Sequence, residues 1–271
     1  MQSIQGHLEN MQNPCGSYVY NIQGHIADLN RGIEMAEKEV DLCPTSHPDH
    51  AVALGNLALY LTTRYQKQDS MMDLNRAIDL RELALKLCPP NHWDYPNRLH
   101  RLALLLHECY QKTKNQSELN RAINLLKEAL GIYSPHHPRF AFTVQSLAAA
   151  ILLLSKSASH PSNQLQDEAF KTYRMLKKCA PAVSLHLLEA VQDWVQNAEK
   201  YSHSSVLEAY QTSLDTLDHF TSLNSSLDSR HETMQARVTD LANNAFSCGI
   251  RHGDFQMAVE LLEQGRGILW N

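Results

Sequence analysis

The sequence predicts an all-α protein, a right-handed α-solenoid of helical hairpins with a period of about 45 residues. Three observations support this fold class. A short motif recurs at constant spacing, apolar residues within each copy follow helical periodicity, and a proline closes each copy. A single helical hairpin cannot cover its own apolar face, so consecutive copies are expected to stack and share one continuous core.

The constant spacing joins several sets of residues. The motif reads DLNRGI from Asp28, DLNRAI from Asp73 and ELNRAI from Glu118, so its copies lie 45 residues apart. The same spacing relates His47, His92 and His137, then Leu57, Leu102 and Leu147, then Ala58, Ala103 and Ala148. Self-similarity this regular indicates that each copy is one structural unit.

Each copy is predicted to contain two helices. In the copy that carries the central motif, the first helix is expected from about Asp49 to Tyr65 and the second from about Met71 to Leu87. Both segments place apolar residues at helical spacing, which predicts one buried stripe on each helix. The hairpin is therefore the repeating element.

Helix ends are also marked in the sequence. Ser70 with Asp73, and Asn115 with Glu118, have the spacing of a capping box, so the second helices are expected to start there. Proline cannot donate a helical hydrogen bond, and the second helices are expected to stop before such residues. The prolines in question are Pro44, Pro89, Pro135 and Pro181.

One helix is expected to be more deeply buried than the rest. The segment from His137 to Lys156 is apolar around most of its circumference. That pattern suits a helix packed between neighbours on both sides. We expect it to be the most protected helix of the protein.

The chain divides into three parts according to how closely each part follows the repeated pattern. Residues 1–27 are interrupted by Pro14 and Gly16 and are expected to form an irregular or incomplete N-terminal hairpin. Residues 28–181 contain the long-period repeats, and residues 182–271 contain more divergent helical hairpins. The hairpin array is thus expected to continue to the last residue of the sequence.

Composition narrows the class of protein. The chain has 271 residues and a formal net charge of −5, and its basic residues are scattered among acidic ones, which argues against a nucleic-acid partner. The longest apolar run, Leu147 to Leu154, is far shorter than the roughly 20 residues that cross a bilayer. No targeting signal is evident at the N-terminus, so we expect no membrane association and a cytoplasmic location, with the six cysteines reduced.

The small residues of the second helices resemble those of tetratricopeptide (TPR) repeats. They are Ala77 with Ala84 and Ala122 with Ala129, and each pair is followed by a proline at the end of the helix. The first copy differs, because it has Gly32 and Glu39 at the equivalent positions. The period exceeds the usual TPR length of about 34 residues. DLNRAI, HPDHAVALGNLA and LCPP at this longer period resemble the stretched TPR arrays of fungal proteins, and this resemblance covers nearly the whole chain.

The C-terminal part carries a second resemblance. SVLEAYQTSLDTL, followed by the segment from Asp228 to Trp270, is similar to the region that joins such arrays to a CHAT domain, a caspase-like peptidase fold. In that family the LLEQGR…LW helix leads on to the peptidase domain. The sequence ends at Asn271, and the catalytic His and Cys of a CHAT domain would lie beyond that residue, so the resemblance assigns no catalytic residue here.

Histidine and cysteine are the residue types in this sequence that could serve as zinc ligands or as a catalytic thiol–imidazole pair. Cys43 with His47, and Cys88 with His92, share a C-x3-H spacing, but equivalent pairs lie one hairpin apart, whereas the ligands of one zinc ion must converge. Capping roles in the loops are the favoured alternative. Two thiol–imidazole combinations, Cys109 with His107 and Cys248 with His252, lack a recognisable oxyanion site. We therefore expect no catalytic residue, no metal and no cofactor.

Six residues are candidates for binding a partner: Arg31, Asn56, Arg76, Arg121, Leu269 and Trp270. The three arginines recur in the repeated motif and could form a ladder for carboxylates along a concave face. The favoured alternative pairs them with acidic residues between repeats. Leu269 and Trp270 place large apolar groups at the C-terminal edge, either packed on the preceding helix or exposed to meet another domain.

The sequence is compatible with three functions. The favoured one is a non-enzymatic TPR scaffold that binds a protein or peptide through its concave face and C-terminal edge. The alternative is the regulatory arm of a split or truncated CHAT-type protease, with a CHAT domain as its partner. A metal- or thiol-dependent enzyme is the third.

Overall fold

The computed structural model describes residues 26–47, 49–157, 163–179, 185–223 and 228–270, with the side chains of residues 223, 228–236 and 270 left out. Within these ranges the chain forms eleven α-helices and the short 3₁₀ helix η2, and no β-strand is found there. The chain divides into two compact units, Met1–Thr113 and Lys114–Asn271. Each unit is described by itself.

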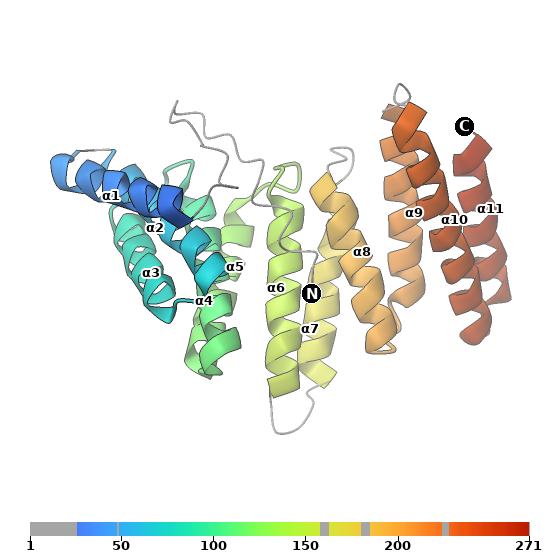
Figure 1. Ribbon diagram of the computed structural model, residues 1–271. Helices are drawn as coiled ribbons and strands as arrows, with labels where there is room; N and C mark the ends of the chain where they lie inside the picture. Colours follow the sequence, from blue (N-terminus) through green and yellow to red (C-terminus); the bar gives the residue numbers. More distant parts are fainter. Residues whose placement is uncertain (1–25, 48, 158–162, 180–184, 224–227, 271) are drawn as a thin grey trace. The chain divides into compact units, whose positions relative to one another are not determined.

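The first unit contains four helices: α1 (Ile26–Leu42), α2 (His50–Gln68), α3 (Met71–Lys86) and α4 (Tyr95–Thr113). Each packs on the next, α1 on α2, α2 on α3 and α3 on α4 (Figure 1). The two helices predicted from Asp49 to Tyr65 and from Met71 to Leu87 correspond to α2 and α3. The prediction of helical hairpins is confirmed for this unit.

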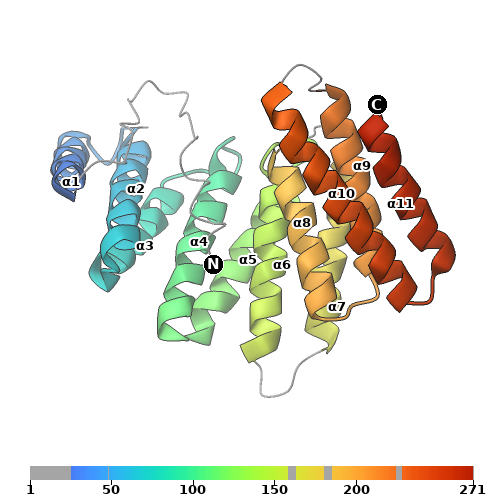
Figure 2. The same ribbon diagram turned by 45° about the vertical axis from the view of Figure 1, so that its right-hand side comes forward.

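The second unit continues with hairpins of the same kind. Its elements are α5 (Gln116–Ile132), α6 (Phe140–Ser157), α7 (Asn163–Tyr173), η2 (Arg174–Lys178), α8 (Leu185–Lys200), α9 (Val206–Leu223), α10 (Asp228–Arg251) and α11 (Phe255–Trp270). Consecutive helices pair, and α9 contacts both α10 and α11 (Figure 2). The last three helices therefore pack as one group.

The repeated residues fill equivalent core positions. Leucines at the 45-residue spacing are buried, and the alanines beside them are completely so: Leu57, Leu102 and Leu147, with Ala58, Ala103 and Ala148. Burying one leucine side chain contributes roughly 1.5–3 kcal/mol, so a short repeated pattern stabilises every hairpin. The repeat is conserved within the chain because the same packing site recurs.

The first copy has Gly32 where the other copies have alanine, and this difference has a steric explanation. A Cβ atom at this position would lie 2.9 Å from Cε1 of Tyr60 on α2, whereas the equivalent Ala77 and Ala122 are accommodated and fully buried. The glycine in α1 thus makes room for an aromatic ring that packs across it.

The predicted helix starts are confirmed. In α3, however, the acidic residue of the predicted capping box bonds to another helix. Ser70 Oγ accepts a hydrogen bond from the backbone N–H of Asp73 at 3.4 Å and caps α3. The Asp73 carboxylate accepts two hydrogen bonds from Arg64 of α2, at 2.8 and 2.7 Å, so it fastens α3 to α2. At α5, Asn115 Oδ1 accepts from the N–H of Ser117 at 3.1 Å, one residue earlier than a capping box requires.

The apolar helix α6 is the central helix of the second unit. It packs against α5, α7 and α8, and eleven of its side chains are buried. By length and composition alone α6 could cross a membrane, but 61% of it is buried within the protein, as in the core helix of a helical bundle. The prediction of a helix covered on both sides is confirmed.

The three predicted sequence regions and the two compact units are different divisions. The boundary between the compact units falls between Thr113 and Lys114 in the chain, inside the predicted repeat region 28–181. Residues 1–25 of the predicted N-terminal region, with Pro14 and Gly16, and the boundary at Pro181 fall outside the described residues, and α1 begins at Ile26. The boundaries at residues 27 and 181 therefore stay predictions.

Candidate protein-interaction sites

The loop histidines at the 45-residue spacing cap the following helix. In each loop the Nδ1 atom of the imidazole accepts a hydrogen bond from the backbone N–H two residues later: Asp49 to His47 at 3.2 Å, Asp94 to His92 at 3.1 Å and Arg139 to His137 at 3.1 Å. An accepting Nδ1 carries no proton, so the geometry requires the Nε2–H tautomer at each loop. The favoured capping role is thereby confirmed.

These loops do not bring metal ligands together. No group of three or more His, Cys, Asp or Glu side chains with metal-binding geometry is found in the described part of the chain. The nearby His50 donates from Nδ1 to the carbonyl oxygen of Cys43 at 2.7 Å, which again fixes the loop. The imidazoles are used to shape the backbone.

Three arginines gather between α3 and α4 in the first unit. Arg98 is buried, donates from Nη1 to the carbonyl oxygen of Ala51 at 2.8 Å, and lies with Nε 3.1 Å from Asp94 Oδ2. Arg101, one helical turn later, donates from Nε to Asn97 at 3.3 Å. Arg81 of α3 completes the set; Arg81, Arg98 and Arg101 are called the arginine cluster below.

The electrostatics of the cluster are unusual at Arg81. Burial, together with repulsion from Arg101 and Arg98, lowers the pKa of Arg81 to about 9, and attraction by Asp94 offsets this only in part. The cluster thus concentrates positive charge in a partly desolvated place.

An exposed tryptophan is next in the sequence to Asp94, the acidic residue beside Arg98. Trp93 directly precedes Asp94 in the loop before α4, and 74% of its surface is accessible. Its ring is tilted against that of His92, with centroids 5.6 Å apart. Tryptophan and arginine are the residues most enriched among the energetic anchors of protein interfaces.

The arginines predicted from the repeated motif form ion pairs. Arg76 Nη1 lies 2.7 Å from Glu37 Oε1 and joins α3 to α1, the second helices of adjacent repeats. Arg121 Nη1 lies 3.3 Å from Glu118 on its own helix, in the other unit. Arg31 is exposed on α1, and Asn56 is half-buried on α2. Partner binding by these four residues stays a prediction.

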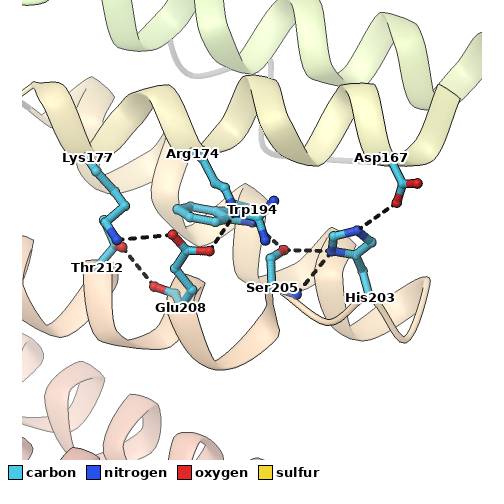
Figure 3. Close-up of polar contacts among 8 residues, drawn as sticks. All are labelled: Asp167, Arg174, Lys177, Trp194, His203, Ser205, Glu208 and Thr212. Atoms are coloured by element: carbon cyan, nitrogen blue, oxygen red, sulfur yellow. Dashed lines mark hydrogen bonds and ion pairs between the residues drawn. The ribbon is translucent and has the colours of Figure 1, made fainter. Parts of the chain in front are cut away.

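A polar network in the second unit was not foreseen from the sequence. Asp167 of α7, His203 and Ser205 lie in a line: His203 Nε2 is 3.3 Å from Asp167, and His203 Nδ1 is 2.8 Å from Ser205 Oγ (Figure 3). The indole Nε1–H of Trp194 donates to the same Ser205 oxygen at 3.1 Å. The His203 ring also stacks on Phe170, with centroids 3.9 Å apart.

This arrangement has the residue types of a Ser-His-Asp triad, but its serine is buried. Ser205 has no accessible surface, so no substrate carbonyl could approach its oxygen. His203 Nδ1 also accepts the backbone N–H of Ser205 at 3.1 Å, and His203 lies three residues before the start of α9, as each loop histidine does before its own helix. The recurring signal was a histidine three residues before the start of a helix, and His203 lies outside the 45-residue spacing.

A charged contact beside this network joins η2 to α9. Glu208 accepts hydrogen bonds from Arg174 Nε at 2.6 Å and Lys177 Nζ at 3.0 Å (Figure 3). Partial burial raises the pKa of Glu208, but the hydrogen bonds from the two cations outweigh it and lower the pKa below its usual value. One carboxylate thus fastens the 3₁₀ turn to the next hairpin.

The thiols of the two thiol–imidazole combinations are buried. Cys109 and Cys248 lie in helix seams, and burial raises the pKa of the Cys248 thiol. Burial also raises the pKa of Cys179 to about 11. A nucleophilic cysteine needs a lowered pKa, so the environments of Cys179 and Cys248 disfavour thiolate chemistry.

The C-terminal helix carries apolar residues on its outer side. Leu269 is half-buried, and the side chain of Trp270 lies outside the described residues. Phe255 and Val259, one turn apart on α11, are 64% and 53% exposed. The exposed apolar surface of this helix therefore includes its first two turns.

Several solved structures are similar to this chain. The crystal structure of BtubC (BKLC) from P. vanneervenii is similar over 90% of this chain and 89% of that chain, with 16% identity and a TM-score of 0.50. A Podosopora anserina putative kinesin light chain with nearly identical TPR-like repeats matches with 16% identity over 90% and 88% of the two chains, and a TM-score of 0.39. The Assembly Chaperone of RpL4 (Acl4) matches with 12% identity over 90% and 92%, and a TM-score of 0.38.

No protein-family model and no curated protein matches the sequence. The similarity to BtubC shows the fold, and the predicted all-α solenoid of helical hairpins is confirmed. The similar solved structures are TPR-like repeat proteins. The fungal and CHAT parts of the resemblance stay predictions.

Proposed function

We propose that this chain is a non-catalytic TPR-like scaffold that binds another protein, and that the arginine cluster with Trp93 is part of the binding surface. The cluster carries the proposal, because it combines partly buried guanidinium groups with a largely exposed indole. Arrays of helical hairpins present extended surfaces of this kind to partners. The partner we propose is a protein or peptide, met in the cytoplasm, and not a nucleic acid or a membrane.

The absence of catalysis in this proposal is supported by burial. Ser205 is inaccessible, and burial raises the pKa of the Cys248 thiol, so neither offers an activated nucleophile at a surface. No cofactor or metal is part of the proposed function.

The proposal can be tested by comparing variants of the full chain in partner capture. The purified chain and its Trp93→Ala and Arg101→Ala variants would be used to retain proteins from a lysate of the source cells, with quantitative mass spectrometry as the readout. Met72→Ala is the matched control, since Met72 is 76% exposed on α3 and lies outside the cluster. We expect a specific protein to be lost from both cluster variants and kept by the control.

Equal retention by all four proteins would contradict the proposed surface. A circular dichroism melt of each variant must first show an unchanged fold. A captured protein should then bind the purified chain directly in a two-component titration.

A second function is favoured by the apolar surface of α11. Phe255 and Val259 are exposed on the helix that resembles the segment leading to a CHAT domain, which supports a role as the regulatory arm of a split or truncated CHAT-type protease. In this alternative the C-terminal edge, with Leu269 and Trp270, meets the peptidase domain. The concave face would then serve as a sensor.

This alternative predicts direct association with a purified CHAT domain from the same organism. Replacing Phe255 and Val259 by serine should weaken that association, while Met72→Ser, at an exposed position on α3, should not. Association that is undiminished in the double variant would count against the C-terminal edge as the docking surface.

A further inference from the structure

We propose that the outer face of α1, marked by Asp28, Met35 and Leu42, is a docking site for an amphipathic helix of another protein. The bound helix carries an arginine and packs on α1 as α2 packs on α3. The inference goes beyond the proposed function, because α1 contributes no residue to the arginine cluster. It rests on the repeat, since the chain itself shows at α3 what covers the equivalent face.

The repeat makes α1 the second helix of a hairpin. It carries the motif DLNRGI from Asp28, as α3 carries DLNRAI from Asp73, and α3 forms its hairpin with the first helix α2. The described residues begin at Ile26, the first residue of α1, so the first helix of this hairpin is not among them. The outer face of α1 can therefore be compared with the face of α3 that α2 covers.

The face of α3 that meets α2 is covered by apolar side chains and one ion pair. Leu80 packs against Ala51 and Leu54 of α2. Asp73, at the start of α3, accepts two hydrogen bonds from Arg64 of α2, at 2.8 and 2.7 Å, and its side chain is 4% exposed. The helix that fits such a face thus supplies an apolar stripe and one arginine.

The equivalent face of α1 is open. Met35, at the position of Leu80, is 65% exposed, and Leu42 is 83% exposed. Asp28, at the position of Asp73, is exposed, and it forms no hydrogen bond or ion pair with another described residue. Asp28, Met35 and Leu42 follow one another at intervals of seven residues, so they lie along one side of the helix.

A groove runs beside this face. Its volume is about 570 Å³, and its lining includes Met35 and Leu42 of α1 and Pro44 of the loop that follows. Grooves with apolar lining bind amphipathic helices through anchors spaced by one or two helical turns. The unpaired carboxylate of Asp28 adds a charge that complements an arginine, as Asp73 does for Arg64 in the neighbouring hairpin.

The residues that precede α1 match this requirement poorly in sequence. The stretch 45 residues before α2 is residues 5–23, and it contains Pro14. Proline inside a helix removes a backbone hydrogen bond and clashes with the preceding turn. Val19 stands at the position of Arg64, and the stretch contains no arginine that could pair with Asp28. A helix from another protein therefore fits the outer face of α1 better.

The test uses α2 as the model ligand. A fluorescein-labelled, blocked peptide of residues 49–68 would be titrated against the full chain by fluorescence anisotropy, with a scrambled peptide of the same composition for comparison. We expect saturable binding of the α2 peptide only. Met35→Ser should weaken it about tenfold through loss of one buried apolar side chain, whereas Met72→Ser, at an exposed position on α3, should not.

A charge exchange distinguishes docking on α1 from replacement of α2 on α3. Asp28→Arg should weaken binding of the α2 peptide at least tenfold by repelling its Arg64, and a peptide with Arg64→Asp should bind that variant again. A peptide that instead replaced α2 beside Asp73 would be insensitive to Asp28→Arg. Asp41→Arg changes an exposed carboxylate of α1 outside the outer face and should leave both affinities unchanged. A thermal melt of each variant checks the fold.

Four results would overturn the inference: no binding of the α2 peptide, equal binding of the scrambled peptide, unchanged affinity in Met35→Ser, or no recovery in the charge exchange. Displacement of the α2 peptide by a peptide of residues 1–25 at a lower concentration than by unlabelled α2 peptide would assign the face to this chain instead. A dimer in sedimentation that is lost in Met35→Ser would assign it to a second copy. None of these results bears on partner capture through Trp93, so the two proposals can fail separately.

Discussion

At the scale of single residues, the backbone hydrogen bonds of the loop histidines depend on the protonation state of their imidazole rings. Nδ1 of His137 accepts the N–H of Arg139 at 3.1 Å, an interaction that only an unprotonated Nδ1 can make. Burial, and then the charge of Arg139, lower the pKa of His137. The folded state thus binds a proton here less readily than the unfolded chain.

This difference predicts acid sensitivity of the loop before α6. Because the folded pKa lies below the ordinary 6.5, the stabilisation from neutral His137 is present above pH 6.5 and is lost as the pH falls through the lowered value. His137→Asn keeps a side-chain acceptor without titrating in this range, so it should show a smaller loss, with a difference of about 1 kcal/mol. Urea unfolding at a series of pH values measures both proteins. Parallel pH profiles would contradict the role of His137.

The buried hydroxyl of Ser205 gives a second prediction. It accepts the indole N–H of Trp194, and both side chains have no accessible surface. Ser205→Ala leaves that N–H without its acceptor and should lower the free energy of unfolding by about 1–3 kcal/mol. The neighbouring Ser204 is exposed, and Ser204→Ala should change stability little. Equal effects of the two substitutions in urea unfolding would show that the hydroxyl contributes nothing specific.

At the scale of helices, the sequence predicted where elements begin but not what joins them. Ser70 caps α3 as expected from local spacing. The partner of Asp73 is Arg64, on the preceding helix, and their contact depends on how α2 and α3 cross. Local patterns contain the cap, whereas the ion pair is set by packing geometry, which a single helix does not determine.

Breaking that pair should be costly. Asp73 is only 4% exposed, so Arg64→Ala would leave a buried carboxylate without its main partner and lower stability by about 3 kcal/mol or more. The exposed pair of Arg76 with Glu37 is the internal comparison, and Arg76→Ala should cost less than about 1 kcal/mol. Chemical denaturation of both variants measures the two losses in the free energy of unfolding. Similar losses would mean that burial of Asp73 is not important for the strength of the pair.

The last hairpin depends on a close approach of two helices. A Cβ atom on Gly265 of α11 would collide with the Cβ of Ala242 on α10, so Gly265→Ala should destabilise by about 1–3 kcal/mol. Gly267→Ala, two residues later, meets nothing within 4 Å and should be neutral or stabilising by up to about 1 kcal/mol, because alanine favours helix. We expect a lowered melting temperature for Gly265→Ala and an unchanged or raised one for Gly267→Ala; equal losses in the two variants would refute the packing argument.

At the scale of the whole molecule, repetition predicted the fold, whereas it drew attention to arginines that form ion pairs within the repeats. The equivalent residues Leu57, Leu102 and Leu147 are all buried, because every hairpin presents the same site to its neighbour. The arginine cluster has no such equivalents: Ala53 and Thr143 stand in place of Arg98. A search for repeated arginines therefore favours residues needed for stacking, and the residues particular to one repeat become visible only when α3 and α4 are placed together.

The repeat architecture also predicts how stability is distributed. In an array each hairpin contacts only its neighbours, so local opening should vary along the chain. Backbone amides of α6, with eleven buried side chains, should exchange hydrogen slowest, and those of α1, with three, should be among the fastest. Hydrogen exchange followed by mass spectrometry measures this directly.

The same measurement on Gly265→Ala tests whether the coupling is local. The substitution strains the contact between α10 and α11, and α9 packs on both helices, so exchange should accelerate in these three helices. Exchange in α2 and α3 should stay at the wild-type rate, because in such an array a perturbation is transmitted only through direct neighbours. Uniform acceleration along the whole chain would instead indicate a single cooperative unit. Unfolding would then be all-or-none, and a destabilising substitution in any hairpin would weaken the arginine cluster equally.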